Sequence, residues 1–266
     1  MDTTTLLQAV LLGAIEGLTE FLPVSSTGHL ILVIDLLGFQ GPSGKFFEIV
    51  IQLGAILAVC WVYRAKLLGV AFHLHDRPPA RHFAAVILVA FLPSMVVGVL
   101  AYRIIKEVLF SPLIVSVMLI VGGIAMLLIE KFRPQPRVHA IEEISLPRAL
   151  AIGLFQCTAM IPGVSRAAAT IMGGMLMGVD RRSATEFSFF LAIPTMLAAT
   201  VYDLYKHWGA LDSSGVLIIA IGFATAFLVA LAVVKLAIGF VGRHGFAPFA
   251  IYRIVLGAIM LMLLLS

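Results

Sequence analysis

The chain has 266 residues, of which 61% are hydrophobic and only 12% are charged, and its mean hydropathy is +1.10. This composition excludes a soluble globular domain and predicts a protein that crosses a membrane several times. The formal net charge of +4 is therefore interpreted through membrane topology, and no nucleic-acid partner is expected.

The first feature along the chain is a pair of apolar stretches, about 6–22 and 24–38, that are each too short or too broken to cross a membrane alone. Two carboxylates precede the break between them. Glu16 and Glu20 are four residues apart, so they share one face of the first helix. Pro23 then ends this helix, because proline has no N–H to donate and disfavours a helical residue before it.

Three consecutive hydroxyls follow this proline, and an imidazole, His29, comes shortly after them. Ser25, Ser26 or Thr27 can cap the next helix, whose first free N–H groups form an anion site. Two acids can bind a cation or a proton, and a helix start lined with hydroxyls can bind an anion. Together they indicate phosphate chemistry. The alternative is that these residues only cap a helix at the membrane interface. An ionised side chain in lipid costs about 2.5–3.5 kcal/mol, which favours a functional role.

Two kinds of apolar stretch follow. Six are long enough to span a membrane, which takes about 20 residues: 47–63, 83–102, 112–130, 186–204, 216–241 and 248–265. Two more, 148–161 and 166–179, form a second short pair that is also split by a proline. Such helix–break–helix units are typical of re-entrant hairpins, because non-helical backbone at membrane depth survives only inside protein or beside water. The prediction is an all-α polytopic membrane protein with six transmembrane helices and two re-entrant helical hairpins, ten helical segments in all.

The two halves of the chain resemble each other around these breaks. Residues 13–29 run G-A-I-E-G-L-T-E-F-L-P-V-S-S-T-G-H, and residues 153–170 run G-L-F-Q-C-T-A-M-I-P-G-V-S-R-A-A-A-T. A glycine, an acid or amide three residues later, a proline and a serine recur in the same order. Three crossings per half is an odd number, so we expect an inverted-topology repeat whose two breaks meet near the midplane. One transmembrane domain, 1–266, then divides into halves 1–130 and 148–266, joined by the linker 131–147.

The distribution of lysine and arginine predicts the orientation. One side of this topology collects eleven of these residues: Arg64, Lys66, Arg77, Arg81, Lys131, Arg133, Arg137, Arg148, Arg181, Arg182 and Arg243. The other side collects four: Lys45, Arg103, Lys106 and Lys206. The first side is cytoplasmic by the positive-inside rule. Both termini are therefore expected outside, and the first hairpin is expected to enter from the outer face.

The second break carries a cation in place of the acids. Its motif, P-G-V-S-R, ends at Arg166, and a guanidinium there suits a phosphate bidentately. Ser165 and Thr170 add hydroxyls near the same face. The alternative is an arginine that pairs with Glu16 or Glu20 only to hold the hairpins together. Three unpaired charges in lipid would cost on the order of 8–10 kcal/mol, so these groups must meet each other, a metal or a phosphate.

Four motifs together resemble one known family over essentially the whole chain. They are E-G-L-T-E-F-L-P-V-S-S-T-G-H, F-E-I-V-I-Q-L-G, P-G-V-S-R-x-x-x-T and E-F-S-F-F-L-A-I-P. These motifs resemble the bacitracin-resistance family of undecaprenyl pyrophosphate phosphatases. The resemblance implies a multi-pass phosphatase of the bacterial inner membrane that returns undecaprenyl pyrophosphate to undecaprenyl phosphate. This reaction recycles the lipid carrier of cell-wall synthesis.

The resemblance also implies the roles of individual residues. Those that match the family's catalytic positions are Glu16, Glu20, Ser26, His29 and Arg166. Those that match its phosphate contacts are Ser25, Thr27, Ser165 and Thr170. Gln52, which shares a helical face with Glu48 beside the first hairpin, is counted with the substrate-binding group. The chain departs from the family at Ala167 and Ala168, where Ser-Gly is usual, and this change leaves the neighbouring matched residues in place.

The mechanism expected from these residues places the pyrophosphate between the two breaks and the prenyl tail among the spans. Glu16 and Glu20 would hold a divalent cation, Mg²⁺ or Ca²⁺, since both ions take oxygen ligands. Ser26 is the preferred nucleophile, with His29 as its base or acid. His29 as the nucleophile and a metal-bound water are the rival assignments. The site is expected to open to the periplasmic side.

Other functions and partners remain open at this point. Inverted repeats with broken helices also occur in secondary transporters, so a polyprenyl-phosphate flippase or an ion-coupled carrier is the alternative. A purely structural scaffold would leave the buried charges unexplained. The expected partners are the isoprenoid pyrophosphate substrate and membrane lipids, and a homodimer is an open assembly state.

Overall fold

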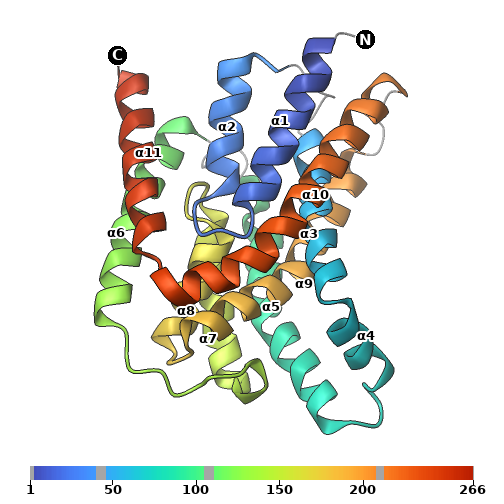
Figure 1. Ribbon diagram of the computed structural model, residues 1–266, viewed down its shortest axis with the longest axis vertical. Helices are drawn as coiled ribbons and strands as arrows, with labels where there is room; N and C mark the ends of the chain where they lie inside the picture. The colour runs from blue at the N-terminus through green and yellow to red at the C-terminus, as the bar shows by residue number, and fades with distance from the viewer. Residues whose placement is uncertain (1–2, 40–45, 105–110, 208–212, 266) are drawn as a thin grey trace.

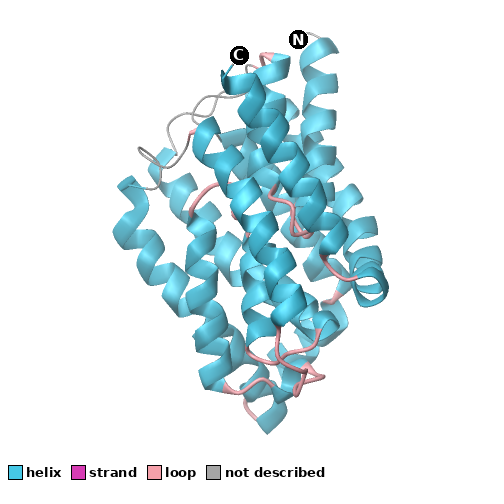
Figure 2. Ribbon diagram, turned by 90° about the vertical axis from the view of Figure 1, so that its left-hand side faces the viewer, coloured by secondary structure: helices cyan, strands magenta, loops and turns pink. Residues whose placement is uncertain are grey.

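The computed structural model describes residues 3–39, 46–104, 111–207 and 213–265, and this part of the chain is helical with no strand (Figures 1 and 2). Val138 and Val179 form an isolated bridge. The α-helices are α1 (Thr3–Thr19), α2 (Ser26–Leu37), α3 (Phe46–Val62), α4 (Arg64–Phe72), α5 (Pro78–Ile104), α6 (Pro112–Phe132), α7 (Leu146–Cys157), α8 (Arg166–Leu176), α9 (Arg181–His207), α10 (Ser213–His244) and α11 (Ala247–Leu265). Two short 3-10 helices, η2 (Ile141–Glu143) and η3 (Thr158–Met160), lie beside α7.

Five of the described helices are long and apolar enough to cross a membrane: Pro78–Ala101, Pro112–Phe132, Arg181–Tyr202, Gly215–His244 and Ala247–Leu265. A sixth span exists if α3 and α4, which are bent by 74° at their junction, are counted as one. The prediction of an all-α polytopic membrane protein is therefore confirmed. The crossing predicted at 47–63 corresponds to α3, and the chain turns beyond it where Arg64 and Lys66 follow the apolar run.

The two predicted short pairs are α1 with α2 and α7 with α8. Each pair is interrupted by non-helical backbone, and α1 and α2 both extend from their break toward the end of the molecule that holds the N- and C-termini (Figure 1). The turn between α4 and α5 lies at the opposite end (Figure 1). Of the four lysines and arginines predicted on the outer side, Lys45 and Lys106 lie outside the described residues.

Glycines let the interrupted helices approach their neighbours closely. A Cβ added at Gly13 of α1 would lie 2.3 Å from the carbonyl oxygen of Gly222 in α10. A Cβ added at Gly153 of α7 would lie 2.3 Å from the carbonyl oxygen of Ala90 in α5. Small residues at helix crossings are the usual means of close packing in membranes, where apolar burial alone gives no preference for protein over lipid. Each interrupted pair is thus fixed against a long helix.

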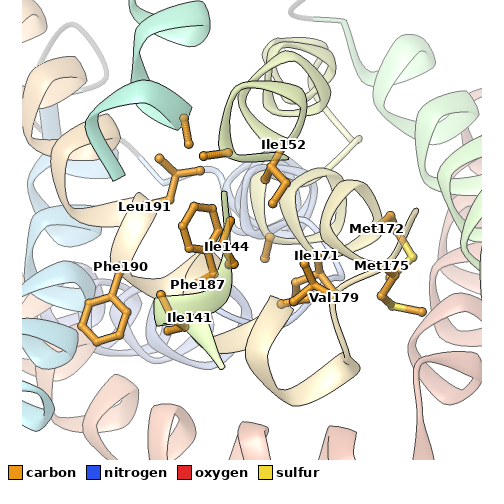
Figure 3. Close-up of a cluster of buried hydrophobic side chains, with 14 of the residues drawn as sticks. Ile141, Ile144, Ile152, Ile171, Met172, Met175, Val179, Phe187, Phe190 and Leu191 are labelled. Atoms are coloured by element: carbon orange, nitrogen blue, oxygen red, sulfur yellow. The ribbon is translucent and has the colours of Figure 1, made fainter. Parts of the chain in front are cut away.

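An apolar core also supports the second break (Figure 3). Ile152 of α7, Ile171 of α8 and Phe187 of α9 are fully buried in it. Ile141 and Ile144, from the segment between α6 and α7, also belong to this cluster. The predicted linker 131–147 is polar in composition, yet three of its residues, Val138, Ile141 and Ile144, pack in the core that supports Arg166.

Candidate active site

Both helix breaks end on a serine with an uncommon backbone conformation. The φ angle is 70° at Ser25 and 75° at Ser165, and no other described non-glycine residue has a positive φ. The Oγ of Ser25 accepts a hydrogen bond from the Gly28 N–H at 3.4 Å, and that of Ser165 from the Ala168 N–H at 3.2 Å. These contacts cap α2 and α8. A non-glycine residue in this region costs about 1–3 kcal/mol, and such strain is concentrated at functional sites.

An ion pair joins the two breaks. Glu20 Oε1 accepts a hydrogen bond from Arg166 Nη2 at 2.9 Å, with only 4% and 11% of the two side chains exposed. The other carboxylate oxygen, Oε2, accepts a hydrogen bond from the Ser26 hydroxyl at 2.5 Å. Of the two acids that the sequence offered to Arg166, the structure therefore pairs Glu20 with it. The same carboxylate is also hydrogen-bonded to the predicted nucleophile.

The guanidinium of Arg166 is also held by Ser188 of α9. Its Nη1 donates to the carbonyl oxygen of Ser188 at 2.9 Å and to the Ser188 hydroxyl at 3.1 Å. The Thr170 hydroxyl lies 2.7 Å from the Ser188 hydroxyl and 2.9 Å from the Arg166 carbonyl oxygen. Thr170 thus supports Arg166 in this structure. The Arg166 Nε is buried without a described partner, which leaves one donor for a ligand.

Glu16 lies one helical turn before Glu20 and is 1% exposed. The Glu20 carboxylate repels the negative charge of Glu16, and the Arg166 guanidinium attracts it. The Oε1 of Glu16 is buried and has no hydrogen-bond partner among the described residues. A buried carboxylate oxygen in this state needs a proton, a water or a cation.

His29 is oriented toward α11. Its Nδ1 lies 2.8 Å from the carbonyl oxygen of Ser25, and its Nε2 lies 2.6 Å from the hydroxyl of Tyr252. The His29 and Tyr252 rings are stacked with their centroids 5.6 Å apart. The structure therefore does not bring His29 to the Ser26 hydroxyl, which donates to Glu20. The partner of Nε2 lies on a distant helix, α11, which residue spacing near His29 does not reveal.

A cavity of about 900 Å³ lies against Glu20, Ser26 and Arg166. The predicted residues that line its polar end are Glu20, Ser25, Ser26, Thr27, Gln52, Ser165 and Arg166. Its apolar walls come from α5 and α9 and include Phe91, Met95, Val99, Met196, Leu197 and Val201. Several of these apolar side chains, among them Met95, Val99 and Val201, are more than a third exposed. Glu16, His29 and Thr170 are not among the lining residues.

The model of the family described as bacitracin resistance protein BacA matches residues 9–259 of the chain. The chain belongs to the BacA family. An undecaprenyl-diphosphatase 2 of Paramagnetospirillum magneticum is 58% identical over 98% of this chain and 99% of that protein. An undecaprenyl-diphosphatase of Methylobacillus flagellatus is 53% identical over 98% of both chains. An undecaprenyl-diphosphatase 3 of Acinetobacter baylyi is 52% identical over 97% of both chains.

Sequence reasoning missed three residues around the site of this BacA-family chain. Ser188 stands within the E-F-S-F-F-L-A-I-P motif but was assigned no role, and Tyr252 gave no signal, because a lone hydroxyl in an apolar stretch does not show what it contacts. Arg253 did give a signal, since an arginine inside a transmembrane stretch marks a candidate functional site. It lies within the predicted span 248–265, and it is fully buried in α11.

The buried pair predicts energetic coupling between the two breaks of this BacA-family protein. Arg166→Met should destabilise the folded state by about 3–5 kcal/mol, because it leaves the Glu20 carboxylate buried without its cation. Adding Glu20→Gln should recover part of this loss, with a coupling of about 1–3 kcal/mol. Unfolding of the four purified proteins in detergent measures both quantities. Strictly additive effects would contradict a direct interaction.

Proposed function

We infer that this chain is a membrane phosphatase that converts undecaprenyl diphosphate into undecaprenyl phosphate and inorganic phosphate. The relatives that carry the name undecaprenyl-diphosphatase match it over nearly its full length. The single observation that carries the inference is the contact of Glu20 with both Arg166 and Ser26 at the polar end of an apolar-walled cavity. A carboxylate, a guanidinium and a hydroxyl in contact are the groups that phosphoryl transfer requires.

The shape of the cavity fits an amphipathic phosphate ester. Its polar end lies at the capped starts of α2 and α8, where free backbone N–H groups and the positive ends of both helix dipoles attract an anion. Arg166 adds a full positive charge. The apolar walls of α5 and α9 would hold the prenyl chain, and their exposed residues offer it a way in from the lipid. The proposed substrate therefore binds with its pyrophosphate between the breaks.

The contacts of Ser26 support an assignment of the chemical step. The Ser26 oxygen attacks the terminal phosphorus, and its proton passes to Glu20, whose Oε2 lies 2.5 Å away. The bond from that phosphorus to the bridging oxygen breaks, and undecaprenyl phosphate leaves with the oxygen. Water then hydrolyses the phosphoserine to release inorganic phosphate and regenerate the serine. Arg166 stabilises the charge that develops on the phosphoryl oxygens.

Glu20 thus takes the proton-transfer role for which the sequence suggested His29. The contacts of His29 to the Ser25 carbonyl and to Tyr252 suit it to hold the start of α2 in place. His29 as the nucleophile and direct attack by water remain the rival assignments.

The acidic pair fits the proposed Mg²⁺ or Ca²⁺. Glu16 offers a buried oxygen without a described partner, directly beside Glu20. No group of three or more histidine, cysteine, aspartate or glutamate side chains in the described part of the chain could hold a metal. Glu16 and Glu20 would hold the cation, since Mg²⁺ and Ca²⁺ both take carboxylate oxygens as ligands. When bound, it would neutralise charge on the phosphates.

We further propose an inverted repeat of halves 1–130 and 148–266 with a site that opens to the periplasm. The matched caps at Ser25 and Ser165 support the repeat, and both termini lie at one end of the molecule (Figure 1). With 17 and 12 residues, α1 and α2 are about 26 and 18 Å long, too short for a core of about 30 Å. The first break therefore reaches the membrane interior from the end that holds the termini. A homodimer stays a prediction.

Purified protein should release phosphate from undecaprenyl diphosphate, and a chelator should stop this release until Mg²⁺ or Ca²⁺ is restored. The measurement is free phosphate against time in detergent. Full activity after chelation would reject the metal proposal and leave the hydrolase intact. Movement of the lipid across vesicle membranes without phosphate release would instead favour the flippase alternative.

Ser26→Ala should lower turnover by about 10³-fold or more, because it removes the nucleophile, while a diphosphate analogue still binds through Arg166. Ser116→Ala is the matched control, since that buried hydroxyl only returns to its own helix at the Pro112 carbonyl. Mass spectrometry of the quenched wild-type enzyme should find phosphate on Ser26. Phosphate on His29 would reverse the assignment.

The orientation is testable by labelling. Ser26→Cys, in a background that lacks Cys60 and Cys157, should react with a membrane-impermeant thiol reagent added outside intact cells. The expectation follows from the entry of the first hairpin at the outer face. Labelling only from the cytoplasmic side of inverted vesicles would contradict this topology.

A further inference from the structure

One buried arginine of α11 contacts both helix breaks at once. Arg253 is 0% exposed. Its Nη1 donates to the carbonyl oxygen of Pro23 at 3.2 Å, and its Nη2 donates to the carbonyl oxygen of Gly163 at 2.8 Å. These carbonyls occupy matching places, because Pro23 and Gly163 each lie two residues before a left-handed serine. Nη2 also lies 3.3 Å from the carbonyl oxygen of Met118 in α6.

The chemistry of the site explains why an arginine is used. Carbonyls at an interrupted helix lose their intrahelical partner, and inside a membrane an unpaired carbonyl is costly. A guanidinium carries five donors in a planar fork, so a single side chain reaches carbonyls on several segments. All described partners of Arg253 are uncharged: three carbonyl oxygens and the sulfur of Met126. This charge is therefore used to bind backbone and not to pair with an acid.

The helix that faces Arg253, α6, leaves room for its side chain at Gly122. A Cβ added at Gly122 of α6 would lie 2.2 Å from Arg253 Nη2 and 3.0 Å from its Cζ. Any larger residue at this position would push the guanidinium away from its carbonyls. Arg253 of α11, Gly122 of α6 and the carbonyls of the two breaks therefore pack together.

We propose that Arg253 is a positioning residue for the phosphatase reaction. It fixes the first break, which carries Glu20 and Ser26, against the second, which carries Arg166. It does not line the cavity, so it acts through those residues and does not touch the substrate. This inference rests on the proposed function, and it concerns the geometry that the reaction needs. Displacement of reacting groups by about 1 Å is enough to cost about 10²-fold in rate.

Two variants test the proposal without removing a reacting group. Arg253→Lys keeps the charge but has no fork, so it reaches fewer of the carbonyls. Gly122→Ala keeps Arg253 but displaces its guanidinium. Alanine favours a helix over glycine, so this change does not weaken α6 through helix propensity. Each should lower kcat about tenfold to 100-fold, while KM stays within about threefold of wild type. Gly239→Ala is the matched control, because nothing lies within 4 Å of a Cβ at Gly239.

The double variant and a stability measurement separate positioning from folding. If both changes act through Arg253, Gly122→Ala on the Arg253→Lys background should cause little further loss. Wild-type kcat in both single variants would overturn the proposal. Additive losses of kcat in the double variant would also overturn it. So would a loss of activity that is fully explained by a smaller fraction of folded protein in detergent.

A readout other than activity keeps the inference distinct from the proposed function. Spin labels at Thr27→Cys and Ala159→Cys, in the background without Cys60 and Cys157, report the distance between the breaks. Arg253→Lys and Gly122→Ala should broaden or shift this distance distribution, and Gly239→Ala should not. An inactive wild type would count against the proposed function alone. An unchanged distribution in both variants would count against the role of Arg253, whatever the activity.

Discussion

The structure depends on the pairing of charge inside an apolar protein. Glu20 and Arg166 come from different interrupted helix pairs, and each is nearly fully buried. Removing one partner would leave the other charge in a low-dielectric interior, where the cost is several kcal/mol. The pair can form only when the two breaks meet. One interaction therefore holds the breaks together and brings the carboxylate, the guanidinium and the neighbouring hydroxyl to one place.

The breaks themselves are stable because protein groups replace the missing helical hydrogen bonds. Irregular backbone at membrane depth is tolerated only inside protein or beside water. Ser25 and Ser165 cap the helix starts by adopting strained backbone, and Arg253 binds a carbonyl on each break. Two helix N-termini can consequently face one cavity, and the free amides of both add to the attraction for a phosphate.

The same groups have different partners with and without substrate under the proposed mechanism. In this structure the guanidinium of Arg166 binds Glu20, which satisfies both charges. A pyrophosphate would offer the guanidinium stronger anionic partners and leave the carboxylate free to accept the Ser26 proton. The donors on Arg166 are already oriented by Ser188, so little reorganisation accompanies the change. The ion pair thus preserves the site until a substrate enters.

The sequence by itself determined the membrane class, the two interrupted helix pairs and the polar residues Glu20, Ser26 and Arg166. These follow from local patterns: hydropathy over about 20 residues, proline and glycine breaks, and charges in apolar surroundings. Tertiary structure decided that Glu20 and not Glu16 pairs with Arg166, that His29 turns to Tyr252, and that α3 bends after Val62. It also gave Arg253 its role, since that side chain meets carbonyls far away in sequence. Such contacts depend on how each helix is rotated and packed, which local spacing does not encode.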